Sequence, residues 1–199
     1  MYRCAIVGVG GNRANGHADA YRTIERGQLV AVSTRNPDKL AAFGERHGIA
    51  ARYTDYREMF AAERLDLVHV NTPPNVRLEI FRAAAEAGIP ALVVEKPLAI
   101  QWEDYSAIAA FARTSPVKIA VNHQLHFHPR RAALQRLVAE GGIGAVRFVD
   151  ASAGMNMAFQ GTHTLQAIRA FLPDRMAHTQ TPQSIFAQAT GAAGLEPTP

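Results

Sequence analysis

The chain has 199 residues, 48% of them apolar, with a formal net charge of +4 and one cysteine, Cys4. This composition is sufficient for a hydrophobic core and excludes general disorder. The length allows one large domain, or one domain and part of another. The mild basicity is too small to indicate a nucleic-acid partner, although it suits a phosphate-bearing ligand.

The cysteine content and the N-terminus indicate the compartment. A single cysteine excludes an internal disulfide and indicates a reducing environment, and Cys4 lies in an apolar run typical of a buried structural thiol. No signal-peptide or transit-peptide pattern precedes this run, and no apolar run approaches membrane-spanning length. We therefore expect a cytoplasmic protein without a membrane partner.

The first unit is predicted to be a strand, a glycine-rich turn and a helix. Residues 2–7 favour a strand and residues 14–26 a helix. The turn between them contains Gly8, Gly10, Gly11, Asn12 and Arg13. Glycines here permit a tight turn and close approach to a pyrophosphate at the helix N-terminus. Arg13 occupies the place of the third glycine of the dinucleotide-binding fingerprint, so a plain glycine turn remains an alternative.

The second strand, residues 29–32, ends in Ser33, Thr34 and Arg35. In a dinucleotide-binding fold this position contacts the adenosine ribose, where an acidic residue binds both hydroxyls and repels a 2′-phosphate. Two hydroxyl side chains and an arginine instead favour that phosphate. The sequence therefore predicts NADP in preference to NAD, with a solvent-facing Arg35 as the alternative.

The following segments alternate between helix and strand. Asn36 and Gly48 are typical of the start and end of a helix over residues 37–47. Helices are also predicted over 56–62, 75–87 and 101–113, and strands near 52–53 and over 66–70, 91–94 and 117–121. This alternation predicts an α/β fold, a Rossmann domain with a doubly wound parallel sheet over residues 1–121.

Two of the later strands end in residues suited to a binding site. Strand 66–70 is followed by Asn71, Thr72 and Pro73, and strand 91–94 by Glu95 and Lys96. Ligands bind outside the carboxyl ends of the strands in open α/β sheets. Lys96 is therefore the first candidate for chemistry.

Residues 122–199 are predicted to begin a C-terminal α+β domain. The pattern favours a helix over 130–140, a strand over 146–152 and a helix over 162–172. From residue 151 onward the charged residues are only Arg169, Asp174, Arg175 and Glu196, so we expect much of this segment to be covered. A loose polar tail after Asp174 is the alternative.

Three histidines follow the predicted sheet. If this stretch were a strand, His126 and His128 would share one face and His123 would point away. No cysteine or nearby carboxylate completes a tetrahedral metal set. We therefore predict no metal here and favour substrate-pocket or loop roles.

The motifs, taken together, resemble one family. The glycine turn at 8–11, the segment 71–74, the triplet 95–97 and the segment 161–163 occur in the order typical of Gfo/Idh/MocA oxidoreductases. The resemblance implies use of NAD or NADP to oxidise or reduce a sugar, inositol or related small carbonyl compound. It also implies an often cis Lys96–Pro97 bond, catalytic roles for Lys96 and His163, and a homo-oligomer through the C-terminal sheet if that domain is complete.

The chemistry follows from these residues. Oxidising a secondary alcohol sends a hydride to the nicotinamide and the hydroxyl proton to a base. Lys96, in a partly desolvated cleft beside a cationic ring, should have a lowered pKa and can accept that proton. His163 can act similarly or bind substrate hydroxyls. The substrate is predicted to contact Lys96, His123, His126, His163 and Gln166.

Two departures from the family pattern limit what the resemblance implies. Relatives of the inositol dehydrogenase type have acidic residues where this chain has Phe159 and Gln166, and full members are substantially longer. The specific substrate is therefore not implied. Two alternatives to a dehydrogenase remain: a cofactor-binding protein without turnover, and a redox-neutral lyase or glycosidase.

Overall fold

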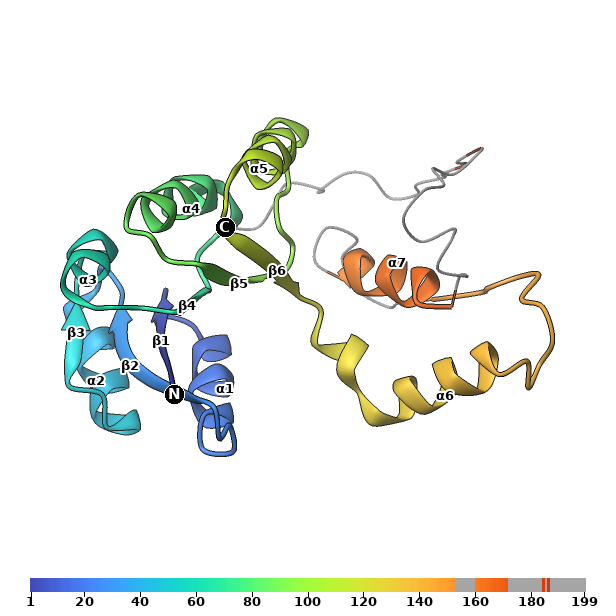
Figure 1. The fold of residues 1–199 in the computed structure, drawn as a ribbon, viewed down its shortest axis with the longest axis horizontal. Coiled ribbons are helices and arrows are strands. Elements are labelled where there is room, and N and C mark those ends of the chain that lie inside the picture. The colour runs from blue at the N-terminus through green and yellow to red at the C-terminus, as the bar shows by residue number, and fades with distance from the viewer. Residues whose placement is uncertain (153–159, 172–183, 185, 187–199) are drawn as a thin grey trace, which may run out of the picture.

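The computed structural model describes residues 1–152, 160–171, 184 and 186, and it contains a six-stranded, all-parallel sheet (Figure 1). The strands are β1 (Tyr2–Val7), β2 (Gly27–Ser33), β3 (Ala51–Tyr53), β4 (Leu67–Val70), β5 (Ala91–Glu95) and β6 (Lys118–Asn122). Their order is β3-β2-β1-β4-β5-β6. The winding reverses between β1 and β4, the point where such sheets bind ligands. The predicted doubly wound Rossmann fold is confirmed.

Helices cover both faces of the sheet. Helices α1 (Asn12–Ala20) and α2 (Pro37–His47) pack on one face, in a cluster that includes Ile6 and Val32. The opposite face carries α3 (Tyr56–Ala62), α4 (Arg77–Glu86) and α5 (Trp102–Thr114). Alternation along each strand sends successive side chains to opposite faces, which is why Ile6 joins the first cluster and its neighbours the second.

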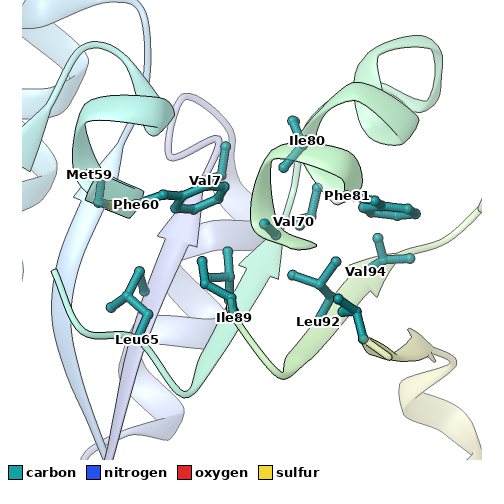
Figure 2. Packing of buried hydrophobic residues seen from close by; sticks show 14 of the residues in the cluster. Val7, Met59, Phe60, Leu65, Val70, Ile80, Phe81, Ile89, Leu92 and Val94 are labelled. Carbon is teal, nitrogen blue, oxygen red and sulfur yellow. The ribbon is translucent and has the colours of Figure 1, made fainter. Parts of the chain in front are cut away.

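The larger cluster holds the second half of the sheet in place. Figure 2 shows Ile80 and Phe81 of α4 over Val70 of β4 and over Leu92 and Val94 of β5. Each of these five side chains is at most 2% exposed. Burial of side chains of this size contributes about 1.5–3 kcal/mol each. The carboxyl ends of β4 and β5 are therefore fixed relative to each other.

Local capping signals were read correctly at α2. The side chain of Asn36 accepts a hydrogen bond from the Lys39 backbone N–H at 3.0 Å, and Gly48 ends the helix in the left-handed conformation, with φ of 67°. Cys4 is buried as expected, and burial raises the pKa of its thiol. These two predictions are confirmed.

Two predicted helices have different bounds. The helix predicted over 14–26 is α1, which ends at Ala20, because the next backbone N–H groups bond three residues back and form tight turns. The Tyr21 hydroxyl meanwhile bonds the His69 ring at 2.8 Å. The helix predicted over 75–87 begins as a 3-10 turn, η1 (Pro74–Val76), and continues as α4.

The segment after β6 contains η2 (Gln124–Phe127), α6 (Pro129–Ala139) and α7 (Thr162–Arg169). Figure 1 shows α6 and α7 beyond the β6 edge of the sheet. The predicted strand 146–152 is wrong: these residues form no strand, because no described segment pairs with them. The strand geometry assumed for the three histidines is also wrong, since His126 lies on η2.

The rest of the predicted second domain is only partly described. Helix α7 matches most of the helix predicted over 162–172, but Leu172 lies outside the described residues, as do Phe159, Asp174, Arg175 and Glu196. Among the residues that are described, no helix combines the length and apolarity needed to cross a bilayer.

Candidate active site

A cavity of about 960 Å³ runs along the carboxyl ends of β1, β2, β4 and β5. It is lined by the glycine turn after β1, the start of the β2–α2 loop, residues 54–57 after β3, the loop after β4, the first turn of α4 and the triplet after β5. The predicted cofactor residues among its lining are Gly8, Gly10, Gly11, Arg13, Ser33, Thr34, Arg35, Asn71, Thr72, Pro73, Glu95 and Lys96. Asn12 is not among them; it begins α1 and is exposed.

Gly8 brings two of these loops into contact. Its φ of +93° is a conformation that side-chain-bearing residues rarely adopt, and a Cβ there would lie 3.0 Å from the Asn71 carbonyl carbon. Only glycine combines this conformation with this close approach. The turn after β1 and the loop after β4 therefore form one continuous wall.

Polar atoms in that wall have no protein partner. Both amide atoms of Asn71 and the hydroxyl of Thr72 are buried without a hydrogen bond among the described residues. Buried polar groups are normally hydrogen-bonded, so unpartnered ones beside a large cavity indicate a polar ligand. The glycine turn, the helix N-terminus behind it and these side chains fit a dinucleotide.

A second cationic side chain, Lys39, lies beside the residues predicted to contact the adenosine ribose. Lys39, in the first turn of α2, lines the cavity together with Thr34 and Arg35. A Cβ at Gly10 would lie 3.5 Å from the Lys39 side chain and 3.8 Å from the Thr34 hydroxyl, so both approach the glycine turn. Lys39 was not predicted from the sequence as a cofactor-binding residue. Its position in the first turn of α2, four residues after Arg35, could have indicated that role.

Glu95 is the hub of a buried polar network. One carboxylate oxygen accepts hydrogen bonds from His17 Nε2 at 2.9 Å and Asn122 Nδ2 at 2.6 Å, and the other lies 3.7 Å from Arg13 Nε. Burial alone would raise the pKa of Glu95, but these partners outweigh it and leave the pKa below its usual range. Glu95 is thus an ionised anchor joining α1, β5 and β6, and sequence reasoning missed His17 and Asn122.

Arg77 links the loop after β4 to the end of β5 and the loop that follows it, through hydrogen bonds to backbone carbonyls. Its side chain is 3% exposed and donates to the Thr72 carbonyl at 2.8 and 3.1 Å and to the carbonyls of Glu95 and Pro97. Burial lowers the pKa of its guanidinium to about 10. Lys96 lies between Glu95 and Pro97, whose carbonyls both accept hydrogen bonds from Arg77. Arg77 therefore sets the position of Lys96. No sequence signal marked it.

Lys96 is placed at the end of this cavity, and the Lys96–Pro97 bond is cis, as the resemblance implied. Burial, then the charge of Arg13, lower the pKa of the Lys96 ammonium, while Glu95 opposes the shift. The expected direction is therefore confirmed. A lysine with a lowered pKa is neutral more often near neutral pH and can accept a proton.

The predicted substrate residues other than Lys96 lie beyond β6 and not in the lining of the large cavity. The rings of His123 and His163 meet edge to face with centroids 5.7 Å apart, and His163 is only 9% exposed in the first turn of α7. Burial, then the charge of Lys96, lower the pKa of both histidines. The influence of Lys96 on both rings places them in its neighbourhood.

The remaining predicted substrate residues pair with each other. Gln166 donates to His126 Nδ1 at 2.7 Å and accepts from Arg131 at 2.7 Å. Gln166 follows His163 by one helical turn and shares its face of α7. The structure thus joins η2, α6 and α7 around this face, and sequence reasoning missed Arg131.

Comparison with known proteins establishes the family. Residues 2–123 match the model of the oxidoreductase family with an NAD-binding Rossmann fold. The chain therefore belongs to the Gfo/Idh/MocA oxidoreductase family. It is 30% identical over 143 residues to a D-apiose dehydrogenase of Paraburkholderia graminis (72% of this chain, 38% of the relative). It is 26% identical over 174 residues to a D-xylose 1-dehydrogenase (NADP(+)) of Haloferax volcanii (77% and 53%).

Solved structures share the fold. An oxidoreductase from Agrobacterium radiobacter in complex with NAD+, L-tartaric acid and magnesium superposes with a TM-score of 0.77 at 21% identity, covering 86% of this chain and 54% of that one. A scyllo-inositol dehydrogenase from Lactobacillus casei with bound NAD(H) and scyllo-inositol gives 0.71 at 22% identity (86% and 56%). The chain spans about half the length of these neighbours and less of some curated relatives.

Proposed function

We propose that the protein is an NADP-dependent oxidoreductase that transfers a hydride between the nicotinamide and a sugar, polyol or related small hydroxyl or carbonyl compound. The observation that carries the proposal is the single cavity joining the glycine turn, Arg35 and Lys96. Family membership and relatives named as sugar dehydrogenases support it.

The preference for NADP rests on the cationic end of the cavity. Arg35 and Lys39, with the Thr34 hydroxyl, line it where the adenosine ribose of a bound dinucleotide lies in this fold. The loop after β2 carries no acidic residue before Asp38. A 2′-phosphate would gain charge-assisted hydrogen bonds from these two cations.

The proposed mechanism assigns a proton step to Lys96. The bound nicotinamide would supply the hydride acceptor. Neutral Lys96 accepts the hydroxyl proton of the substrate while the hydroxyl-bearing carbon of the substrate gives up a hydride. In the reverse direction Lys96 returns this proton to the substrate oxygen. Arg77 holds the backbone on both sides of Lys96, so the amine needs little reorganisation. His163, neutral because its pKa is lowered, orients the substrate through a ring N–H or nitrogen lone pair.

Residues 122–199 would supply the substrate side of this site. We place the domain boundary after residue 121, with His123, His126, His163 and Gln166 contributed by the second segment. We also propose that the protein forms a homo-oligomer through the sheet of the second domain, if that domain is complete.

Turnover tests the proposal. Nicotinamide absorbance is followed with NADP+ and a panel of aldoses, polyols and inositols, for the parent chain and for Lys96→Ala and His163→Ala. We expect reduction of NADP+ that falls by about 10²–10⁴-fold in Lys96→Ala, the usual contribution of a general base. A parent chain that binds NADPH but turns over no member of the panel would instead support a cofactor-binding protein without turnover.

A further inference from the structure

The substrate end of the site carries an excess of positive charge. Arg13 and Lys96 line the large cavity next to Glu95. The charge of Lys96 acts on both rings of the His123–His163 pair, and the charge of Arg13 acts on His163. Within the described residues, Glu95 is the acid that acts on Lys96 and on the two histidines. Two cationic side chains therefore face one carboxylate.

The Glu95 carboxylate already has protein partners for both of its oxygens. Glu95 is 7% exposed, and its oxygens accept from His17 and Asn122 and pair with Arg13. A neutral sugar presents many hydroxyl donors, which sites commonly meet with carboxylate or carbonyl acceptors. Glu95 has little capacity left to meet them.

The segment that follows the sheet adds donors and almost no acids. Among the described residues that follow the sheet, 123–152 and 160–171, there are five arginines and four histidines but two acids, Glu140 and Asp150, both exposed. On α7, the position one turn after His163 is an amide, Gln166, which binds Arg131. The Nδ1 atoms of His123 and His163 are buried without a partner among the described residues, and His163 as a whole is nine-tenths buried.

The following inference rests on the proposed function and concerns the charge of its substrate. We propose that the site takes an anionic substrate, a sugar acid or hydroxy acid, whose carboxylate is held by Arg13 together with the His123–His163 pair. A substrate carboxylate would be met by these hydrogen-bond donors. The redox step is unchanged: hydride leaves the hydroxyl-bearing carbon and Lys96 takes the hydroxyl proton.

Binding to the full chain tests this without requiring turnover. Ring signals of ¹³C-labelled histidine, assigned with His123→Gln and His163→Gln, are followed during titration with matched pairs: D-glucuronate and D-glucose, D-galacturonate and D-galactose. Each titration is made with and without saturating NADPH. In at least one pair we expect the acid to shift both signals at a concentration about tenfold lower than its neutral partner, as a charge-assisted hydrogen bond allows.

Two variants make the result specific. Arg13→Gln should weaken binding of the acid about tenfold, whereas Arg113→Gln, which removes the same charge from the exposed end of α5, should leave it unchanged. Neutral sugars that bind as tightly as their acids in every pair would overturn the inference, as would equal effects of the two variants. NADPH binding, measured separately by fluorescence, tests the proposed function. The titrations without NADPH test the preference of the site for acids over neutral sugars, even if NADPH fails to bind.

Discussion

At the scale of single residues, Lys96 is the side chain whose protonation matters most. Its ammonium is partly buried and lies near Arg13, and both effects favour the neutral amine. We predict that Lys96 titrates below its ordinary value of 10.5 and that Arg13→Gln moves this pKa upward, because a repelling charge is removed. The ¹³Cε shift of labelled Lys96 measures both. A pKa unchanged by Arg13→Gln would show that burial alone sets it, and Arg113→Gln is the charge-matched control.

The position of a residue in the fold could be predicted from sequence where neighbours in the chain are also neighbours in space. Lys96 directly follows β5 and Arg35 lies two residues past the end of β2, and in a parallel sheet the carboxyl ends of strands meet at one edge. His17, Arg77 and Asn122 were missed because their partners are 78, 18 to 20 and 27 residues away. Only the fold brings these groups together, so no local pattern marks them.

At the scale of elements, the site depends on how two loops are held. Arg77 donates to carbonyls of the loops after β4 and after β5, and none of these bonds uses a carboxylate partner. Arg77→Met would leave several buried carbonyls without a donor. We predict a loss of about 3 kcal/mol in the free energy of unfolding, measured by urea denaturation, and weaker NADPH binding.

A matched core variant separates these two effects. Ile108 of α5 is 2% exposed and belongs to the cluster on the α3–α5 face, away from the cavity lining. Ile108→Ala should lose comparable stability, about 2–5 kcal/mol, yet bind NADPH as the parent does. If both variants bind NADPH equally well, Arg77 is a structural residue without a positioning role.

Element boundaries were predictable where capping chemistry is local and unpredictable where tertiary contacts decide. The bounds of α2 followed from Asn36 and Gly48. The end of α1 did not, since the Tyr21 hydroxyl that follows it bonds His69 on another element. Residues 146–152 have a strand-like pattern, but a strand requires a partner.

At the scale of the whole molecule, His69 links stability to pH. It lies in β4, with its Nε2 bonded to Tyr21 and its Nδ1 without a partner among the described residues. Burial, then the charge of His17, lower its pKa to about 4. Because the unfolded chain binds this proton near pH 6.5, stability is full above that pH and is lost as the pH falls toward 4. The loss from this group amounts to about 3 kcal/mol.

Urea denaturation between pH 7 and 4 checks this effect. His69→Gln keeps a polar partner for Tyr21 but cannot titrate, so its stability should decline less steeply with falling pH. His128→Gln, which removes an exposed histidine at the start of α6, should retain the slope of the parent. A parent slope that persists in His69→Gln would locate the proton uptake at other groups.

The glycine turn, the polar wall and the cationic end of the cavity are proposed to bind NADP together. Fluorescence titration of the full chain with NADPH and NADH tests this proposal most directly, with Arg35→Gln and Lys39→Gln alongside the parent. We predict NADPH binding at least about tenfold tighter than NADH binding, a preference largely lost in Arg35→Gln and reduced in Lys39→Gln. Equal or tighter binding of NADH by the parent chain would contradict the account.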